Sequence, residues 1–151
     1  MISSSLTITL SKKSKIIFFD SAKLFIDKPN GKNVVSSFKR ASSILESELK
    51  DKNIELSNTT DPGIFKTEFE KNLYKKINEL RKYFQNINKD ENFEESINNL
   101  ADSKKVIFDF FDNVIVNEDD ITIKKNRLEL IQMLCKTFNY YVNFSLIDSH
   151  Q

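Results

Sequence analysis

Residues 61–87, with the sequence DPGIFKTEFEKNLYKKINELRKYFQNI, decide the fold class of this chain. Asp61 is suited to accept hydrogen bonds from the first free amides of a helix, and Pro62 fits the first helical position. The apolar residues that follow recur at steps of three or four, at Phe65, Phe69, Leu73, Ile77, Leu80, Phe84 and Ile87. This spacing predicts one long amphipathic helix with a single apolar stripe facing a core.

Helical patterns also flank this stretch. Upstream, apolar residues recur at helical steps from Val34 to Leu49, after a turn-forming Pro29-Asn30-Gly31 that ends an apolar segment over 16–27. Downstream, Phe93, Ile97 and Leu100 predict a shorter helix. Residues 106–116 are densely apolar, and periodicity does not distinguish a buried helix from a strand there.

A final helix is predicted after Glu118-Asp119-Asp120, which supplies acceptors for a helix start. At about 100° per residue, one polar stripe is expected in solvent. It comprises Thr122, Lys125, Glu129, Gln132, Lys136, Asn139 and Asn143. The opposite, core-facing arc comprises Ile123, Leu130, Leu134, Phe138 and Tyr141.

Arg127 projects into the middle of this apolar arc, where an unpaired guanidinium would cost several kcal/mol, so it requires a partner. The favoured interpretation is an internal ion pair with Asp109, Asp112 or Asp119. The alternative is contact with a phosphate or base of RNA. Both are compatible at a helix edge, where a carboxylate can align the guanidinium.

The composition limits the function. The chain has 151 residues, enough for one domain, and its 23 Lys+Arg against 22 Asp+Glu give a net charge of +1. This balance excludes a general polyanion binder, so any RNA contact must be local. With one Cys, one His, 2 Gly and 2 Pro, the chain offers no internal disulfide, zinc cluster, Ser-His-Asp centre or glycine-rich phosphate loop.

We therefore expect no catalytic residue and no metal site, since the paired acidic residues serve as helix starts. Residues 1–15 are expected to form a flexible or short extended tail, and residues 16–151 one helical domain. No apolar stretch approaches the roughly 18 residues of a membrane helix, and cysteine usage suggests a reduced, cytoplasmic protein.

Several stretches together resemble a known family. They are residues 110–116 (FFDNVIV), 118–120 (EDD), 126–128 (NRL) and 142–147 (VNFSLI). Upstream, residues 33–45, with Lys39-Arg40-Ala41, and residues 61–74 match as well. In this order and spacing, over roughly residues 16–147, they resemble the DALR-type anticodon-binding domain at the end of the bacterial-type glycyl-tRNA synthetase β subunit. The chain departs from the family at Lys124, where the motif has Arg, and in being far shorter than the family's β chain.

The resemblance implies an all-α bundle of about five to six helices that binds the anticodon region of tRNA(Gly). It also implies two partners, the synthetase α subunit and the rest of the β subunit. Adenylate formation is attributed to the α subunit, so ATP and Mg serve the holoenzyme, and this chain needs no cofactor. The tRNA-binding candidates are Lys39, Arg40, Lys124, Lys125, Asn126 and Arg127.

Two tyrosines are further candidates for RNA contact, and two alternative functions remain open. Tyr140 and Tyr141 can stack on bases, but their spacing near Phe138 favours core packing. One alternative is the DALR domain of another synthetase, such as the arginyl enzyme. The other is a helical scaffold that binds only protein, which the net charge suits equally well.

Overall fold

The computed structural model describes residues 28–50, 54–87 and 93–141, and within these ranges all regular structure is helical. The elements are α3 (Pro29–Leu49), the short 3-10 helix η1 (Pro62–Ile64), α4 (Glu68–Asn86), α5 (Phe93–Asp102), α6 (Lys104–Asn113) and α7 (Ile121–Tyr141). The expected all-α fold is confirmed. The proposed tail over 1–15, the segment over 16–27 and the family-like segment over 142–147 lie outside the described residues.

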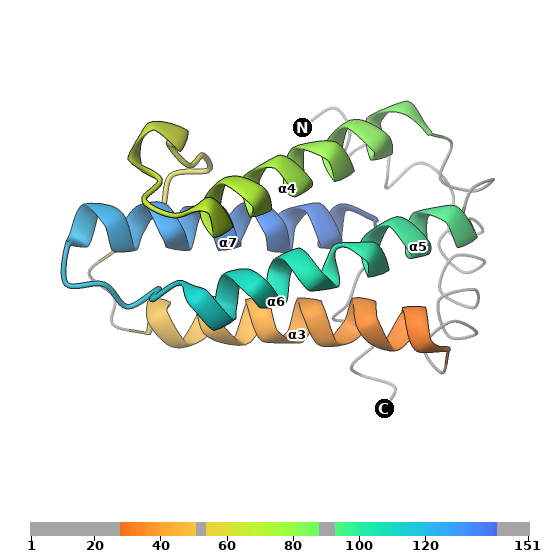
Figure 1. The fold of residues 1–151 in the computed structure, drawn as a ribbon, viewed down its shortest axis with the longest axis horizontal. Coiled ribbons are helices and arrows are strands. Elements are labelled where there is room, and N and C mark those ends of the chain that lie inside the picture. The colour runs from red at the N-terminus through yellow and green to blue at the C-terminus, as the bar shows by residue number, and fades with distance from the viewer. Residues whose placement is uncertain (1–27, 51–53, 88–92, 142–151) are drawn as a thin grey trace.

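The helices form an antiparallel bundle (Figure 1). α3 runs one way, α4 runs back on the opposite side of the bundle, α5 and α6 follow one another in the direction of α3, and α7 runs in the same direction as α4. α7 packs against both α3 and α4, while α6 packs against α4 and α5 against α3. No helix among the described residues is long and apolar enough to cross a membrane.

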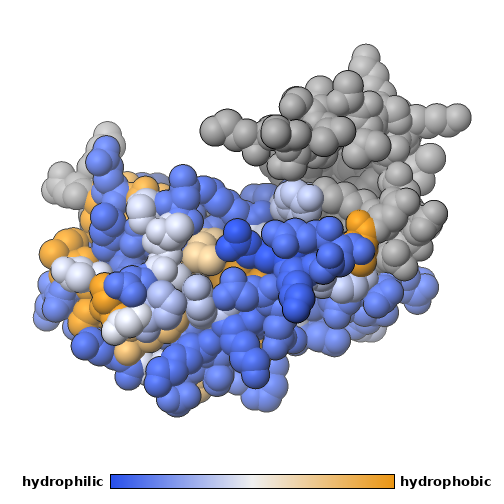
Figure 2. Space-filling model, turned by 90° about the horizontal axis from the view of Figure 1, so that it is seen from above, coloured by the Kyte–Doolittle hydropathy of each residue, from blue (hydrophilic) through white to orange (hydrophobic). Residues whose placement is uncertain are grey.

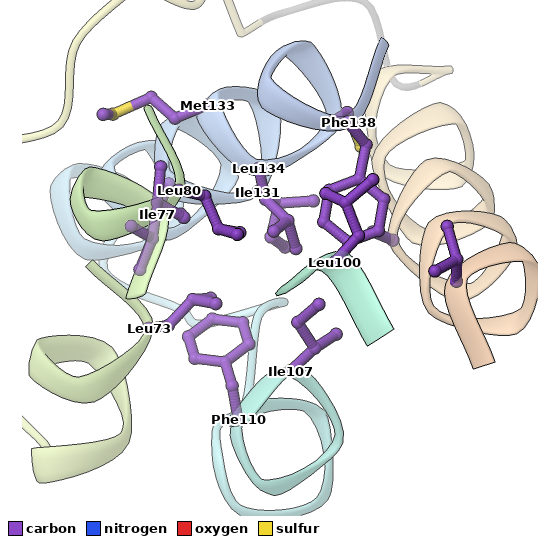
Figure 3. Packing of buried hydrophobic residues seen from close by; sticks show 14 of the residues in the cluster. Leu73, Ile77, Leu80, Leu100, Ile107, Phe110, Ile131, Met133, Leu134 and Phe138 are labelled. Atoms are coloured by element: carbon purple, nitrogen blue, oxygen red, sulfur yellow. The ribbon is translucent and has the colours of Figure 1, made fainter. Parts of the chain in front are cut away.

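The core lies where the predicted apolar stripes meet (Figure 3). Burial of such stripes is the main stabilising term for helices of this length. α4 contributes Leu73, Ile77, Leu80 and Phe84, all buried. They meet Ile107 and Phe110 of α6, and Leu130, Ile131, Leu134 and Phe138 of α7. The predicted inner faces of α4 and α7 are therefore confirmed at these positions.

The start of α4 differs from the prediction. Asp61 does act as a cap, since its Oδ1 accepts from the Gly63 amide at 2.9 Å, but it caps only the single turn of η1. The α-helix begins at Glu68 because Thr67 and Glu70 form a reciprocal capping box. The Thr67 hydroxyl oxygen accepts from the Glu70 amide, and the Glu70 carboxylate accepts from the Thr67 amide.

Three other boundaries are now fixed. Pro29-Asn30-Gly31, expected as a turn, forms the first turn of α3, as the preference of Pro for the first helical position allows. The ambiguous segment over 106–116 is helical to Asn113 and extended at Val114. Asp120 starts α7 as predicted, because its Oδ1 accepts from the amides of Thr122 and Ile123.

Candidate nucleic-acid interface

Arg127 lies at the centre of a buried polar network. Its side chain is 6% exposed, and its Nε donates to Oε1 of Glu70 at 2.9 Å. Its Nη1 donates to the Ile115 carbonyl at 2.6 Å and to Oε2 of Glu118 at 3.4 Å. The expectation that Arg127 pairs internally is therefore confirmed.

The partners predicted for Arg127 are wrong. Asp112 pairs with Arg40 and Asp109 with Lys105, each at the surface of α6, and Asp119 is exposed in the loop before α7. The main partner is Glu70, 57 residues away along the chain. Packing of α7 against α4 decides this choice, and the sequence pattern of α7 alone does not contain that information.

Glu70 is held as a carboxylate although it is almost fully buried. Burial by itself raises the pKa of a carboxyl group. Hydrogen bonds from Arg127, from the Thr67 hydroxyl, and from the amides of Lys66 and Thr67 outweigh this effect and lower the pKa of Glu70 below its ordinary value. The charge on Glu70 therefore neutralises the buried guanidinium.

The neighbouring candidates on α7 also make internal contacts. Lys124 Nζ lies 3.1 Å from Oε2 of Glu48 at the end of α3 and donates to Asn117 at 3.0 Å. The Asn126 side chain is 4% exposed, and its Oδ1 accepts from the Thr60 hydroxyl at 2.8 Å. The first half of α7 thus holds α3, α4 and the segment over 54–61 together.

Glu129 was predicted in solvent, and this prediction is wrong. The residue is 5% exposed because the segment over 54–61 crosses this side of α7. Its carboxylate accepts from the Ser57 amide at 2.7 Å and from the Ser57 hydroxyl. A polar stripe predicted from helical geometry is solvent-exposed only if no other segment covers it.

The remaining candidates lie nearer the surface and in two places. Lys39 is exposed on α3, and Lys125 is half-buried on α7 and forms no ion pair with the residues that the structure describes. Arg40 pairs with Asp112 at 2.8 Å, and its guanidinium lies 4.8 Å from the ring centre of Phe108. The structure therefore groups Lys124, Asn126 and Arg127 around one end of the bundle. Arg40 lies against α6 instead, through its contacts with Asp112 and Phe108.

From the sequence, Arg81 is a candidate for a local tRNA contact and Tyr140 for base stacking, but the sequence did not predict that they share one basic surface with Lys136. Arg81 of α4 is exposed, as are Lys136 and Tyr140 one turn apart on α7, and these three line one groove. The prediction that Tyr140 packs in the core is wrong, because the residue is 45% exposed. The available signal was the spacing of Lys136 and Tyr140, which places them on one helix face.

The described surface thus offers cations, amide groups and an aromatic ring, which are the groups that contact phosphates and unpaired bases. Within the same residues, no group of three or more His, Cys, Asp or Glu is placed to hold a metal ion. These features define a class of all-helical bundle whose surface can make local contacts with RNA.

Comparison with known families agrees with this class. The family model described as "DALR anticodon binding domain" matches residues 34–144, and the chain belongs to this family. Its relatives include the glycine–tRNA ligase beta subunit of Rickettsia bellii, 36% identical over 126 residues, and that of Rickettsia prowazekii, 31% identical over 125 residues. Each match covers 83% of this chain and 18% of the relative, so the chain spans less than a fifth of the relatives' length.

Proposed function

We propose that this chain binds the anticodon region of tRNA(Gly) as the C-terminal part of a glycine–tRNA ligase β subunit, and so supports glycyl-tRNA synthesis. The observation that carries the proposal is the extent of the similarity. The 36% identity extends over 126 residues, 83% of the chain, and the family match over 34–144 includes most of the helical bundle.

The six candidate residues divide into two roles in this proposal. Lys39, Arg40 and Lys125 are accessible enough to contact phosphates, which set the register of the RNA on the protein. Lys124, Asn126 and Arg127 are buried and paired, and they fix the surface that carries the accessible cations. The net charge of +1 requires the affinity to come from a few such contacts.

The proposal also assigns partners. The relatives are named as beta subunits, so this chain is proposed to act with an α subunit and with the rest of a β subunit in the cytoplasm. Catalysis, with ATP and Mg, is then proposed to belong to the assembled ligase. This chain contributes tRNA binding and needs no cofactor of its own.

Fluorescence anisotropy with the full 151-residue chain and labelled tRNA(Gly) transcripts tests the proposal. The expected result is tighter binding of tRNA(Gly) than of a transcript with an exchanged anticodon, with affinity falling as salt rises. Lys39→Gln is expected to reduce the salt dependence by about one ion per lost phosphate contact. Lys32→Gln, an equally exposed change on α3, is the matched control.

Equal affinity for tRNA(Gly) and unrelated tRNA would overturn the proposal. Preference for a different anticodon, such as that of tRNA(Arg), would indicate that the domain belongs to another synthetase. Co-purification with an α subunit without any tRNA affinity would favour a protein-binding scaffold.

A further inference from the structure

A groove lies between the C-terminal halves of α4 and α7, which diverge toward their ends (Figure 1). Its volume is about 450 Å³, within the range of roughly 300–1,000 Å³ typical of small-ligand sites. It is lined by Asn58, Arg81, Phe84, Gln85, Met133, Lys136, Thr137 and Tyr140. Figure 2 looks onto the α4 side of the bundle and shows a mainly hydrophilic surface with small apolar areas.

The groove is positively charged. Its lining contains Arg81 and Lys136, one on each helix, and no carboxylate. Arg81 forms no ion pair within the described part of the chain, and Lys136 donates to the amide oxygen of Asn58. Elsewhere on α4, Lys71 and Lys76 are paired with Glu68 and Glu79. The charge at the groove therefore remains available to an anion.

The groove also has an apolar and aromatic side. Phe84 and Met133 are buried at 3% and 8% exposure and form its base, and Met133 extends from α7 away from Ile107 and Phe110 (Figure 3). Tyr140 is 45% exposed at the edge of the groove. The side-chain amides of Gln85 and Asn58 supply hydrogen-bond donors and acceptors beside it.

We propose that this groove binds one unpaired nucleotide of RNA, with the base against Tyr140 and the adjoining phosphates between Arg81 and Lys136. The inference rests on the proposed function and adds a second tRNA-contacting surface to the one that carries Lys39, Arg40 and Lys125. A cation pair alone would suit an acidic peptide equally well. A partly exposed tyrosine in the same groove as side-chain amides that both donate and accept favours a nucleobase, whose face stacks and whose edge hydrogen-bonds.

The test uses the full chain and an anticodon stem-loop RNA of tRNA(Gly) that carries 2-aminopurine in the loop. Arg81→Gln and Lys136→Gln are each expected to weaken binding about tenfold, the equivalent of roughly 1.4 kcal/mol. Lys82→Gln is the matched control, because Lys82 is an exposed cation next to Arg81 on α4 that does not line the groove. Its effect is expected to be under about threefold.

Stacking has its own readout. Binding to the native chain is expected to quench 2-aminopurine fluorescence at one loop position, Tyr140→Ala to abolish this quenching, and Tyr140→Phe to retain it. Unchanged melting temperatures exclude misfolding as the cause. If Arg81→Gln and Lys136→Gln bind RNA like Lys82→Gln, the groove assignment is overturned while the proposed function stands. If the native chain binds no RNA, both fail.

Discussion

The side chain of Asn126 on α7 binds the backbone of Asp61 through both of its polar atoms. Its Oδ1 accepts from the Asp61 amide at 2.7 Å, and its Nδ2 donates to the Asp61 carbonyl at 2.9 Å. The two residues are 65 positions apart. This pairing anchors the segment before α4 to the centre of the bundle and satisfies polar groups that are partly removed from water.

Replacing Asn126 by Ala is expected to destabilise the fold by about 1–3 kcal/mol, because the Asp61 amide loses its acceptor. The Asp61 carbonyl and the Thr60 hydroxyl each lose one of two partners and keep the Ile64 amide and the residue 126 backbone carbonyl, respectively. Urea unfolding followed by circular dichroism measures the change. Asn139→Ala, an exposed change on the same helix, is expected to stay within about 0.5 kcal/mol. Equal stability of the two variants would show that the Asn126 contacts contribute nothing.

Removing the guanidinium of Arg127 is expected to cost more. Arg127→Met leaves Glu70 charged and buried without its main cation, a loss of about 3–5 kcal/mol. The double variant Arg127→Met/Glu70→Gln should be more stable than the sum of the single changes predicts, since it removes the isolated charge. The surface pair of Lys71 and Glu68 serves as the control, with a coupling below about 1 kcal/mol. Strict additivity at Arg127 and Glu70 would contradict their direct coupling.

Glu70 also predicts a pH dependence. Hydrogen bonds from Arg127 and Thr67 lower its pKa below the ordinary value of 4.5. A carboxyl group with a lowered folded-state pKa contributes stability above its unfolded-state pKa, and this contribution is lost as the pH falls through the folded-state pKa. Relative to the native chain, the deficit of Glu70→Gln should therefore be constant near pH 7 and shrink below about pH 4. Urea unfolding at a series of pH values measures it, and a constant deficit at all pH values would refute the assignment.

Cys135 is expected to be unreactive in the folded protein. Burial and the nearby charge of Glu46 raise the pKa of this thiol from 9.0 to about 12, so almost no thiolate forms near neutral pH. At pH 8, a disulfide reagent that absorbs on reaction should modify the thiol only as fast as the protein unfolds. After urea unfolds the protein, the Cys135 thiol should be labelled rapidly and stoichiometrically. Rapid labelling of the native chain would show that the region around Cys135 opens without global unfolding.

The sequence by itself determined that the fold is all-helical and which side of most helices faces the core. Steps of three and four between apolar residues give the direction of each stripe around its own axis, which is a local property of the chain. The stripe from Leu73 to Phe84 and the arc from Leu130 to Phe138 are buried for this reason. The same geometry showed that Arg127 needs an internal partner, because its side chain projects from α7 into the apolar arc.

The tertiary structure alone decided which neighbour covers each face. Glu70 became the partner of Arg127, Glu129 became buried under residues 54–61, and Tyr140 remained exposed at a groove. Each outcome depends on segments more than 50 residues apart in the chain. Helical periodicity describes one helix at a time, whereas burial and pairing depend on how several helices pack together. The candidate RNA surface is formed by residues from different helices, so only the packing of those helices could reveal it.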